Sequence, residues 1–139
     1  RSIVRQTPLK QNKLARWQRI ITEAAEQSGR GRIPTLSQPI PYHTALEVAQ
    51  TSHLAMIPWE NEPDLTIAAT LAPKRHNLQN QINSVALLIG PEGGFTETEI
   101  QNAQAANITP ITLGPRILRA ETAAIVATAL TLHELGEMN

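Results

Sequence analysis

The sequence has 139 residues, of which 41% are hydrophobic and 17% are charged. This length suits one globular domain, and the composition is too apolar and too weakly charged for a disordered chain. Cysteine is absent, which excludes disulfides, thiolate metal sites and a cysteine nucleophile, and suits a cytoplasmic protein. No window approaches the roughly 18 uninterrupted apolar residues of a membrane span, and the polar, basic N-terminus lacks a signal-peptide core.

Charge is balanced over the whole chain and unbalanced along it. Lys and Arg number 12, as do Asp and Glu, yet the first 32 residues hold eight basic against two acidic side chains, a net charge of +6. Such a segment is typical of either a phosphate-facing surface or a solvated helix face. With only four aromatic residues, the chain lacks a base-stacking platform of the RRM or OB type.

The first half of the chain alternates short apolar runs with one long amphipathic segment. Apolar spacing, a capping box and breaking Gly and Pro residues set the expected boundaries. The predicted elements are a strand at Ser2–Arg5, a helix at Lys10–Ser28 ending before Gly29, a strand at Arg32–Leu36, a helix from the capping box Thr44–Glu47 to Gln50, a strand at Leu54–Ile57, a helix at Asp64–Leu71 and a polar loop at Pro73–Asn83.

The second half gives sharper signals. A continuous apolar run of strand length predicts a strand covered on both faces, and a capping box follows it. The last helix is apolar almost all round, so we expect a second subunit to bury part of it. The predicted elements are a strand at Val85–Ile89, a helix at Glu97–Ala106 with a Phe95–Ile100 staple and an Asn107 cap, a strand at Pro110–Leu113 and a helix at Glu121–Leu135 ending at Gly136.

Strands that alternate with helices predict an α/β domain with a mainly parallel sheet. Ligands bind such sheets beyond the carboxyl ends of the strands. Three loops therefore become candidate binding segments: Pro58–Glu60, Gly90–Gly94 and Gly114–Arg119.

The loop Gly90–Gly94 holds three of the seven glycines and leads into a helix N-terminus, where free N–H groups favour anions and polar acceptors. It fits neither the dinucleotide GxGxxG pattern nor a P-loop, so a tight turn without a ligand is the alternative.

Arg119 precedes a helix N-terminus, which is unfavourable for a cation unless the cation binds a phosphate or carboxylate. An ion pair of Arg119 with Glu121 or Glu92 is the alternative. The four histidines lack zinc-ligand spacing, and no metal site is predicted.

Two segments together resemble a known family. The stretches Val85–Ile100 (VALLIGPEGGFTETEI) and Ile111–Ala123 (ITLGPRILRAETA) are similar to the two hallmark segments of the SPOUT-class small-subunit ribosomal RNA methyltransferase E family. The stretch Lys13–Arg30 also resembles that family, and the match is in order over nearly the whole chain. The resemblance implies a SPOUT-type fold with helices on both faces of the sheet and a deep trefoil knot near the C-terminus.

The same resemblance implies an enzyme that uses S-adenosyl-L-methionine to methylate N3 of one uridine in small-subunit, bacterial-type ribosomal RNA. Because the sulfonium of this donor is already activated, no metal is expected. The apolar C-terminal helix predicts a homodimer formed through it, and the absence of cysteine suits a cytoplasmic location. The resemblance also implies that residues 1–139 are one methyltransferase domain, without its first strand and helix and without an N-terminal PUA-like RNA-binding domain.

The donor-binding residues follow from the matching motifs, and the catalytic candidates follow from the chemistry of methyl transfer. Arg119 and Glu121 are the catalytic candidates, with Arg119 stabilising charge on the base and Glu121 taking a proton or orienting the arginine. The candidate donor-binding residues are Ile57, Pro58, Gly90, Pro91, Glu92, Gly93, Leu113, Gly114, Ile117, Leu118 and Arg119. The candidate RNA contacts are Arg16, Arg30, Arg32 and Arg116. The alternative function is a non-catalytic nucleotide-binding or dimerisation module built on the same loops.

Overall fold

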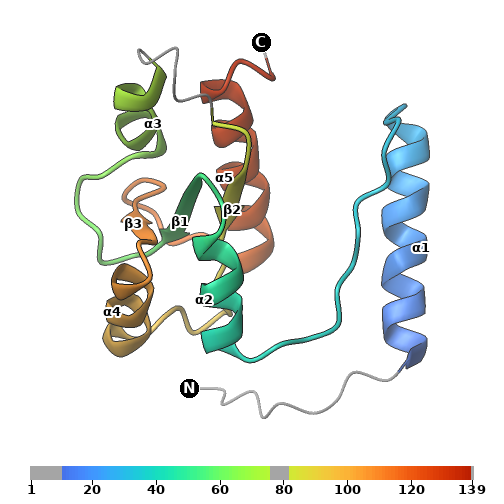
Figure 1. Cartoon of the computed structure of the whole chain (residues 1–139), viewed down its shortest axis with the longest axis horizontal. Coiled ribbons are helices and arrows are strands. Elements are labelled where there is room, and N and C mark those ends of the chain that lie inside the picture. Colours follow the sequence, from blue (N-terminus) through green and yellow to red (C-terminus); the bar gives the residue numbers. More distant parts are fainter. Residues whose placement is uncertain (1–10, 76–81, 139) are drawn as a thin grey trace. The chain divides into compact units, whose positions relative to one another are not determined.

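The computed structural model describes residues 11–75 and 82–138. The chain divides into two compact units, residues 1–41 and 42–139, and each is described by itself (Figure 1). The predicted strand at Ser2–Arg5 lies outside the described residues. None of the described helices is both long and apolar enough to cross a lipid bilayer.

The first unit contains helix α1, Gln11–Gln27, close to its predicted bounds. Gly29 ends it in the left-handed conformation, with φ 68°, and the Arg30 N–H donates to the Ala25 carbonyl at 3.0 Å. This bond satisfies one of the carbonyl groups that the end of the helix leaves without a partner in the helix. The predicted strand at Arg32–Leu36 was wrong, because no described strand pairs with this segment and a lone extended segment is not a sheet.

The second unit is built on a three-stranded sheet of order β2-β1-β3. Strand β1 is Leu54–Pro58, β2 is Val85–Leu87 and β3 is Thr109–Ile111. Both neighbours run parallel to β1, and Met56 pairs with a residue of each. The predicted parallel sheet is therefore confirmed, and all three strands end at the same edge.

Helices cover both faces of this sheet, as predicted. Alternate residues of β1 point to opposite faces, so Ile57 packs with one set of helices and Met56 with the other. Helices α2 (Tyr42–Gln50) and α4 (Glu97–Ala105) supply one buried cluster, and α3 (Ile67–Arg75) and α5 (Ala120–Glu134) supply the other. The fully buried large side chains are Met56, Ile57, Leu71, Ile100, Ile108 and Ile111.

Helix α4 begins as its sequence predicted. Thr96 is its N-cap, and the capping box is complete: the Glu99 N–H donates to Thr96 Oγ1 at 3.1 Å and the Thr96 N–H donates to Glu99 Oε2 at 2.7 Å. Phe95 packs against the cluster that contains Ile100, in agreement with the predicted staple. Asn107 follows the helix with φ 61°, as the predicted left-handed residue.

Two other helix starts were predicted wrongly. Helix α2 begins at Tyr42 rather than after a Thr44 cap, because Tyr42 packs inward and its hydroxyl donates to the Glu99 carbonyl at 2.8 Å. Helix α3 begins later than Asp64, because the Glu62 carboxylate accepts the Leu65 N–H at 3.1 Å and holds a turn there.

The remaining boundaries are also corrected. Helix α3 runs through Pro73 to Arg75, so the predicted loop at Pro73–Asn83 starts too early, and its residues 76–81 lie outside the described ones. Strand β2 stops at Leu87, two residues before its predicted end, and only β1 flanks it. Its half-buried residues pack alternately toward the two core clusters, Ala86 toward one and Val85 and Leu87 toward the other, so the predicted cover on both faces is confirmed. Strand β3 starts at Thr109, one residue before its predicted start, and ends at Ile111, two before its predicted end.

The two outer edges of the sheet differ. In the parallel ladder between β1 and β3, the backbone groups of Pro110 point away from β1, toward the outer edge. Proline has no N–H, so this position offers no hydrogen-bond donor at that edge. The next outward donor, the Thr112 N–H, is taken by the Leu65 carbonyl at 2.7 Å. On β2, the backbone N–H and C=O groups of Val85 and Leu87 point away from β1 by the same alternation, and they have no hydrogen-bond partner among the described residues.

We expect the phenol of Tyr42 to titrate above its usual pKa of 10.0, because burial raises its pKa and the nearby Glu99 carboxylate raises it further. It is the only tyrosine, so the ultraviolet absorbance of tyrosinate reports it alone. The folded state keeps this proton to a higher pH than the unfolded chain, so the free energy of unfolding falls as pH rises above 10.

A Tyr42→Phe variant provides the control for this titration. It should lose about 0.5–1.5 kcal/mol of stability near neutral pH with the lost hydrogen bond. Its unfolding free energy should then fall less steeply than that of the parent above pH 10. An absorbance midpoint at or below 10 in the folded protein would contradict the assignment.

Candidate functional site

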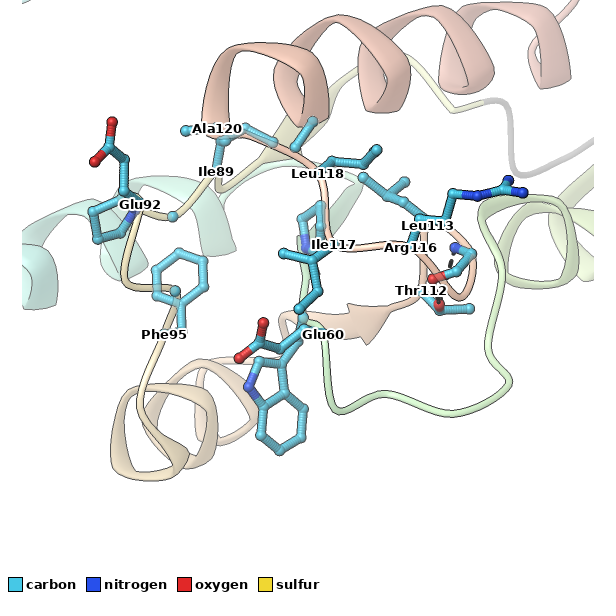
Figure 2. A pocket seen from close by; sticks show the side chains of 17 residues that line it. Glu60, Ile89, Glu92, Phe95, Thr112, Leu113, Arg116, Ile117, Leu118 and Ala120 are labelled. Carbon is cyan, nitrogen blue, oxygen red and sulfur yellow. Dashed lines mark hydrogen bonds between the residues drawn. The ribbon is translucent and has the colours of Figure 1, made fainter. Parts of the chain in front are cut away.

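The three candidate loops meet in one pocket at the carboxyl edge of the sheet (Figure 2). The pocket is an open hollow with about 690 Å³ of space between its walls, the solvent at its mouth included. Its lining residues are Pro58, Trp59, Glu60, Ile89, Gly90, Pro91, Glu92, Gly94, Phe95, Thr112, Leu113, Gly114, Arg116, Ile117, Leu118, Ala120 and Ala123.

The end of β1 supplies Trp59 and Glu60. The Trp59 backbone N–H donates to the Ile111 carbonyl at 2.9 Å, which continues the β1–β3 ladder past the last strand residue. The Trp59 ring is half-buried against the α2–α4 side of the core. Its indole Nε1–H is fully buried and has no partner among the described residues. A buried donor without a partner is unfavourable, so a ligand acceptor at this position would be stabilised.

The glycine-rich loop is a tight turn fixed by an aromatic ring. The Gly94 N–H donates to the Pro91 carbonyl at 2.9 Å, and Gly94 has φ 69°. A Cβ on Gly90 would lie 3.0 Å from Cε2 of Phe95, so the ring packs directly on this backbone. The Phe95 ring in turn lies 6.1 Å, centroid to centroid, from that of Tyr42. The loop is thus held from beneath by side chains of α2 and of the α4 start.

The third loop leads from β3 to α5. Thr112 Oγ1 accepts the Gly114 N–H at 3.1 Å, and Gly114 has φ 109°, a conformation open only to glycine. Ile117 is 83% exposed at the pocket. The loop ends at Arg119, the N-cap of α5, which makes no side-chain capping bond. The first N–H groups of α5 therefore have no side-chain cap and are available to a polar ligand.

Most of the predicted donor-binding residues line this pocket, and three do not. Ile57 is fully buried in the core beneath it, so only its neighbour Pro58 reaches the surface there. Gly93 and Arg119 belong to the loops around the pocket but do not line it. The catalytic candidate Glu121 does not line it either. The predicted residues that line it are Pro58, Gly90, Pro91, Glu92, Leu113, Gly114, Ile117 and Leu118.

The predicted RNA contacts are spread over both units. Arg16, Arg30 and Arg32 are exposed in the first unit, and Arg116 is exposed at the pocket in the second. Arg119 is exposed too, and across the described part of the chain its side chain makes no hydrogen bond or ion pair. The alternative in which Arg119 pairs with Glu121 or Glu92 is therefore not seen in this structure.

Sequence reasoning missed several pocket residues. The Trp59 side chain was not chosen, although aromatic residues make up only 3% of the chain and this one directly follows a buried strand. The other residues not chosen individually are Glu60, Ile89, Gly94, Phe95, Thr112, Ala120 and Ala123. Within the described ranges, no group of three His, Asp or Glu side chains could hold a metal ion.

Comparisons with known proteins place this chain in a family. A family model described as an RNA methyltransferase domain matches residues 1–132. The chain is 46% identical over 120 residues to ribosomal RNA small subunit methyltransferase E of Synechocystis, covering 86% of this chain and 38% of that protein. It is 39% identical over 115 residues to the protein of that name from Mesomycoplasma hyopneumoniae, covering 83% of this chain and 46% of that protein.

A solved structure extends the likeness. Ribosomal RNA small subunit methyltransferase E from Neisseria gonorrhoeae, bound to S-adenosyl methionine, matches with a TM-score of 0.70 and 34% identity. The match covers 94% of this chain and 52% of that one. The chain thus spans about half the length of the proteins it resembles, or less.

We expect Gly90→Ala to be about 1–3 kcal/mol less stable than Gly93→Ala, because the new methyl must displace the Phe95 ring. A Cβ on Gly93 meets nothing within 4 Å, so Gly93→Ala is the matched control. Both variants reduce the entropy of the unfolded chain in the same way, so their difference isolates the packing. Urea unfolding measures it, and equal midpoints would show that Phe95 does not hold the loop.

Proposed function

We propose a function from one established premise: the chain belongs to the RNA methyltransferase domain family. We propose that its protein transfers a methyl group from S-adenosyl-L-methionine to N3 of a uridine in small-subunit, bacterial-type ribosomal RNA. A ribosomal RNA substrate implies a cytoplasmic location. The observation that carries this proposal is the convergence of both hallmark segments, Val85–Ile100 and Ile111–Ala123, on one pocket with the end of β1. The similarity to a structure bound to S-adenosyl methionine supports it.

The pocket fits a nucleoside-containing donor. Apolar walls from Leu113, Ile117 and Leu118 suit a base, and close backbone at Gly90 and Gly114 suits polar atoms that need near approach. The donor brings an activated methyl group on its sulfonium. The protein's task is then to align sulfur, methyl and acceptor nitrogen in line.

The side chains around α5 would handle charge and proton. During transfer the methyl–sulfur bond breaks and a methyl–N3 bond forms, while the N3 proton must leave to a base. The Arg119 guanidinium has no partner in the described structure and can stabilise negative charge on the uracil oxygens. Glu121, in the first turn of α5, can accept the proton or orient Arg119. The exposed Arg16, Arg30, Arg32 and Arg116 would contact RNA phosphates.

We also propose that the domain is larger than the strands described here. The outward backbone groups of Val85 and Leu87 leave an open edge on β2, where a first strand of the domain would pair. A PUA-like domain in the same protein would add RNA contacts. The β3–α5 segment would form a deep trefoil knot, as the family resemblance implies.

The alternative of a non-catalytic nucleotide-binding or dimerisation module is not favoured, since the similar proteins are named methyltransferases.

Calorimetry tests donor binding by this chain. We expect S-adenosylmethionine and S-adenosylhomocysteine to bind with micromolar dissociation constants, on the order of −8 kcal/mol, and AMP to bind much more weakly. Gly93→Val should weaken binding, because the branched side chain would keep the donor away from the backbone of that turn. A Cβ on Gly93 meets nothing within 4 Å, so the variant should still fold. A preference for AMP would contradict the proposal and favour a general nucleotide-binding module.

Methyl transfer tests the role of Arg119. In the natural full-length protein, Arg119→Ala should keep donor affinity and lower the single-turnover rate on small-subunit RNA about 10²–10³-fold. Arg119→Lys should also be slower, because lysine lacks the planar fork. Transfer at the parental rate would exclude Arg119 from the chemistry. An equal fall in donor affinity and rate would instead assign it to the donor site.

We propose that α5 forms a homodimer with a second copy. Its sequence predicts a helix buried on most of its surface, in part by a second subunit. Within one chain only Ala127 and Thr131 of the described α5 residues are buried. Ile125 is 71% exposed and Leu130 is 43% exposed. An exposed apolar helix face is typical of an interface, and twofold dimers are the commonest oligomers.

Sedimentation or light scattering at micromolar concentration tests the dimer. Ile125→Glu should give a folded monomer, because the side chain is already outside the core. Val48→Glu on α2, where the parent residue is 59% exposed, is the matched control and should remain dimeric. A wild-type monomer under these conditions would rule out the proposed interface.

A further inference from the structure

Three charged side chains line the pocket: Glu60, Glu92 and Arg116. Together they carry a net charge of −1. None of the three has a hydrogen bond or ion pair through its side chain in the described structure. The pocket therefore presents an uncompensated negative charge to whatever it binds.

Glu60 reaches across the pocket, whereas Glu92 does not. Glu60 follows the ladder-held Trp59, and its Oε1 lies 3.8 Å from the Cβ position of Gly94 on the opposite loop. Figure 2 shows its carboxylate between Phe95 and Ile117. The Glu92 carboxylate points away from the other labelled side chains in the same view.

The fold does not need a carboxylate at Glu60. The nearby N-terminus of α4 is already satisfied by its own capping box, Thr96 with Glu99. The adjoining turn is held by the Gly94 N–H bond to Pro91. The apolar neighbours Phe95 and Ile117 offer the Glu60 carboxylate no hydrogen bond and no opposite charge. A positively charged ligand would balance its negative charge.

We propose that Glu60 is a specificity-determining residue that favours the positively charged methyl donor over its neutral product. This inference rests on the proposed function. S-adenosylmethionine carries a sulfonium, and transfer of the methyl group leaves a neutral thioether in S-adenosylhomocysteine. The two ligands share every other group. Glu60 therefore attracts one ligand more than the other, and the attraction disappears when the methyl group leaves, which assists product release.

The ratio of the two dissociation constants, product over donor, isolates this effect. In the wild-type chain the ratio should decrease with added salt, because the charges are near the surface. Glu60→Gln should lower the ratio about 2–5-fold by weakening donor binding while leaving product binding unchanged, as expected for one solvent-exposed charge pair. Glu60→Asp keeps the charge and should retain most of the preference. Glu97→Gln makes the same charge change on the exposed first turn of α4, outside the pocket, and should leave the ratio unaltered.

Calorimetry at fixed ionic strength, with thermal melts of each variant, separates the outcomes. Equal losses for both ligands in Glu60→Gln would overturn the inference and make Glu60 a general binding residue. An unchanged ratio would overturn it as well, and a shift in Glu92→Gln alone would assign the selection to Glu92. If the wild-type chain binds neither ligand, the proposed function itself fails, and that result is distinct from the other three.

Discussion

The parallel pairing of β1 with β2 on one side and β3 on the other is the constraint on which the site depends. Parallel strands end at one edge, so the segments that follow them must emerge together. The ladder also continues beyond the strands: the Leu88 N–H donates to the Met56 carbonyl at 3.0 Å, and the Trp59 N–H to the Ile111 carbonyl. The pocket loops therefore leave the sheet from fixed backbone positions, and a ligand meets groups that are already in place.

A second layer of order comes from side chains below the loops. Phe95 contacts the Gly90 backbone from one side and pairs with the Tyr42 ring on the other. Because the Tyr42 hydroxyl is bonded to α4, these contacts join α2, α4 and the glycine-rich loop into one unit. The pocket can accordingly use backbone atoms with little rearrangement, and Glu60 adds a carboxylate that none of these contacts involves.

Sequence patterns predicted the elements whose signals are local. The apolar run at Val85, the glycine turn and the Thr96–Glu99 capping box lie within a few residues of one another, and all three were confirmed. Boundaries set by distant partners were not predictable in this way: α2 starts at Tyr42 because of a bond to a residue 57 positions away. The two hallmark loops were likewise identified from their sequences. The Trp59 and Glu60 side chains carry no local motif, and only the sheet edge brings them to the pocket.

The different edges of the sheet have a consequence for how copies of this chain behave when crowded, for instance during synthesis. An exposed strand edge can template another chain, which leads to aggregation. On β3 the outward position of Pro110 offers no donor, and the next outward donor is bonded to Leu65. Two molecules therefore cannot join sheets through β3, and stacking into an open-ended polymer is blocked after one junction. Among the strands that the structure describes, β2 is the edge left open to strand exchange, so whatever covers it also protects the protein from self-templated assembly.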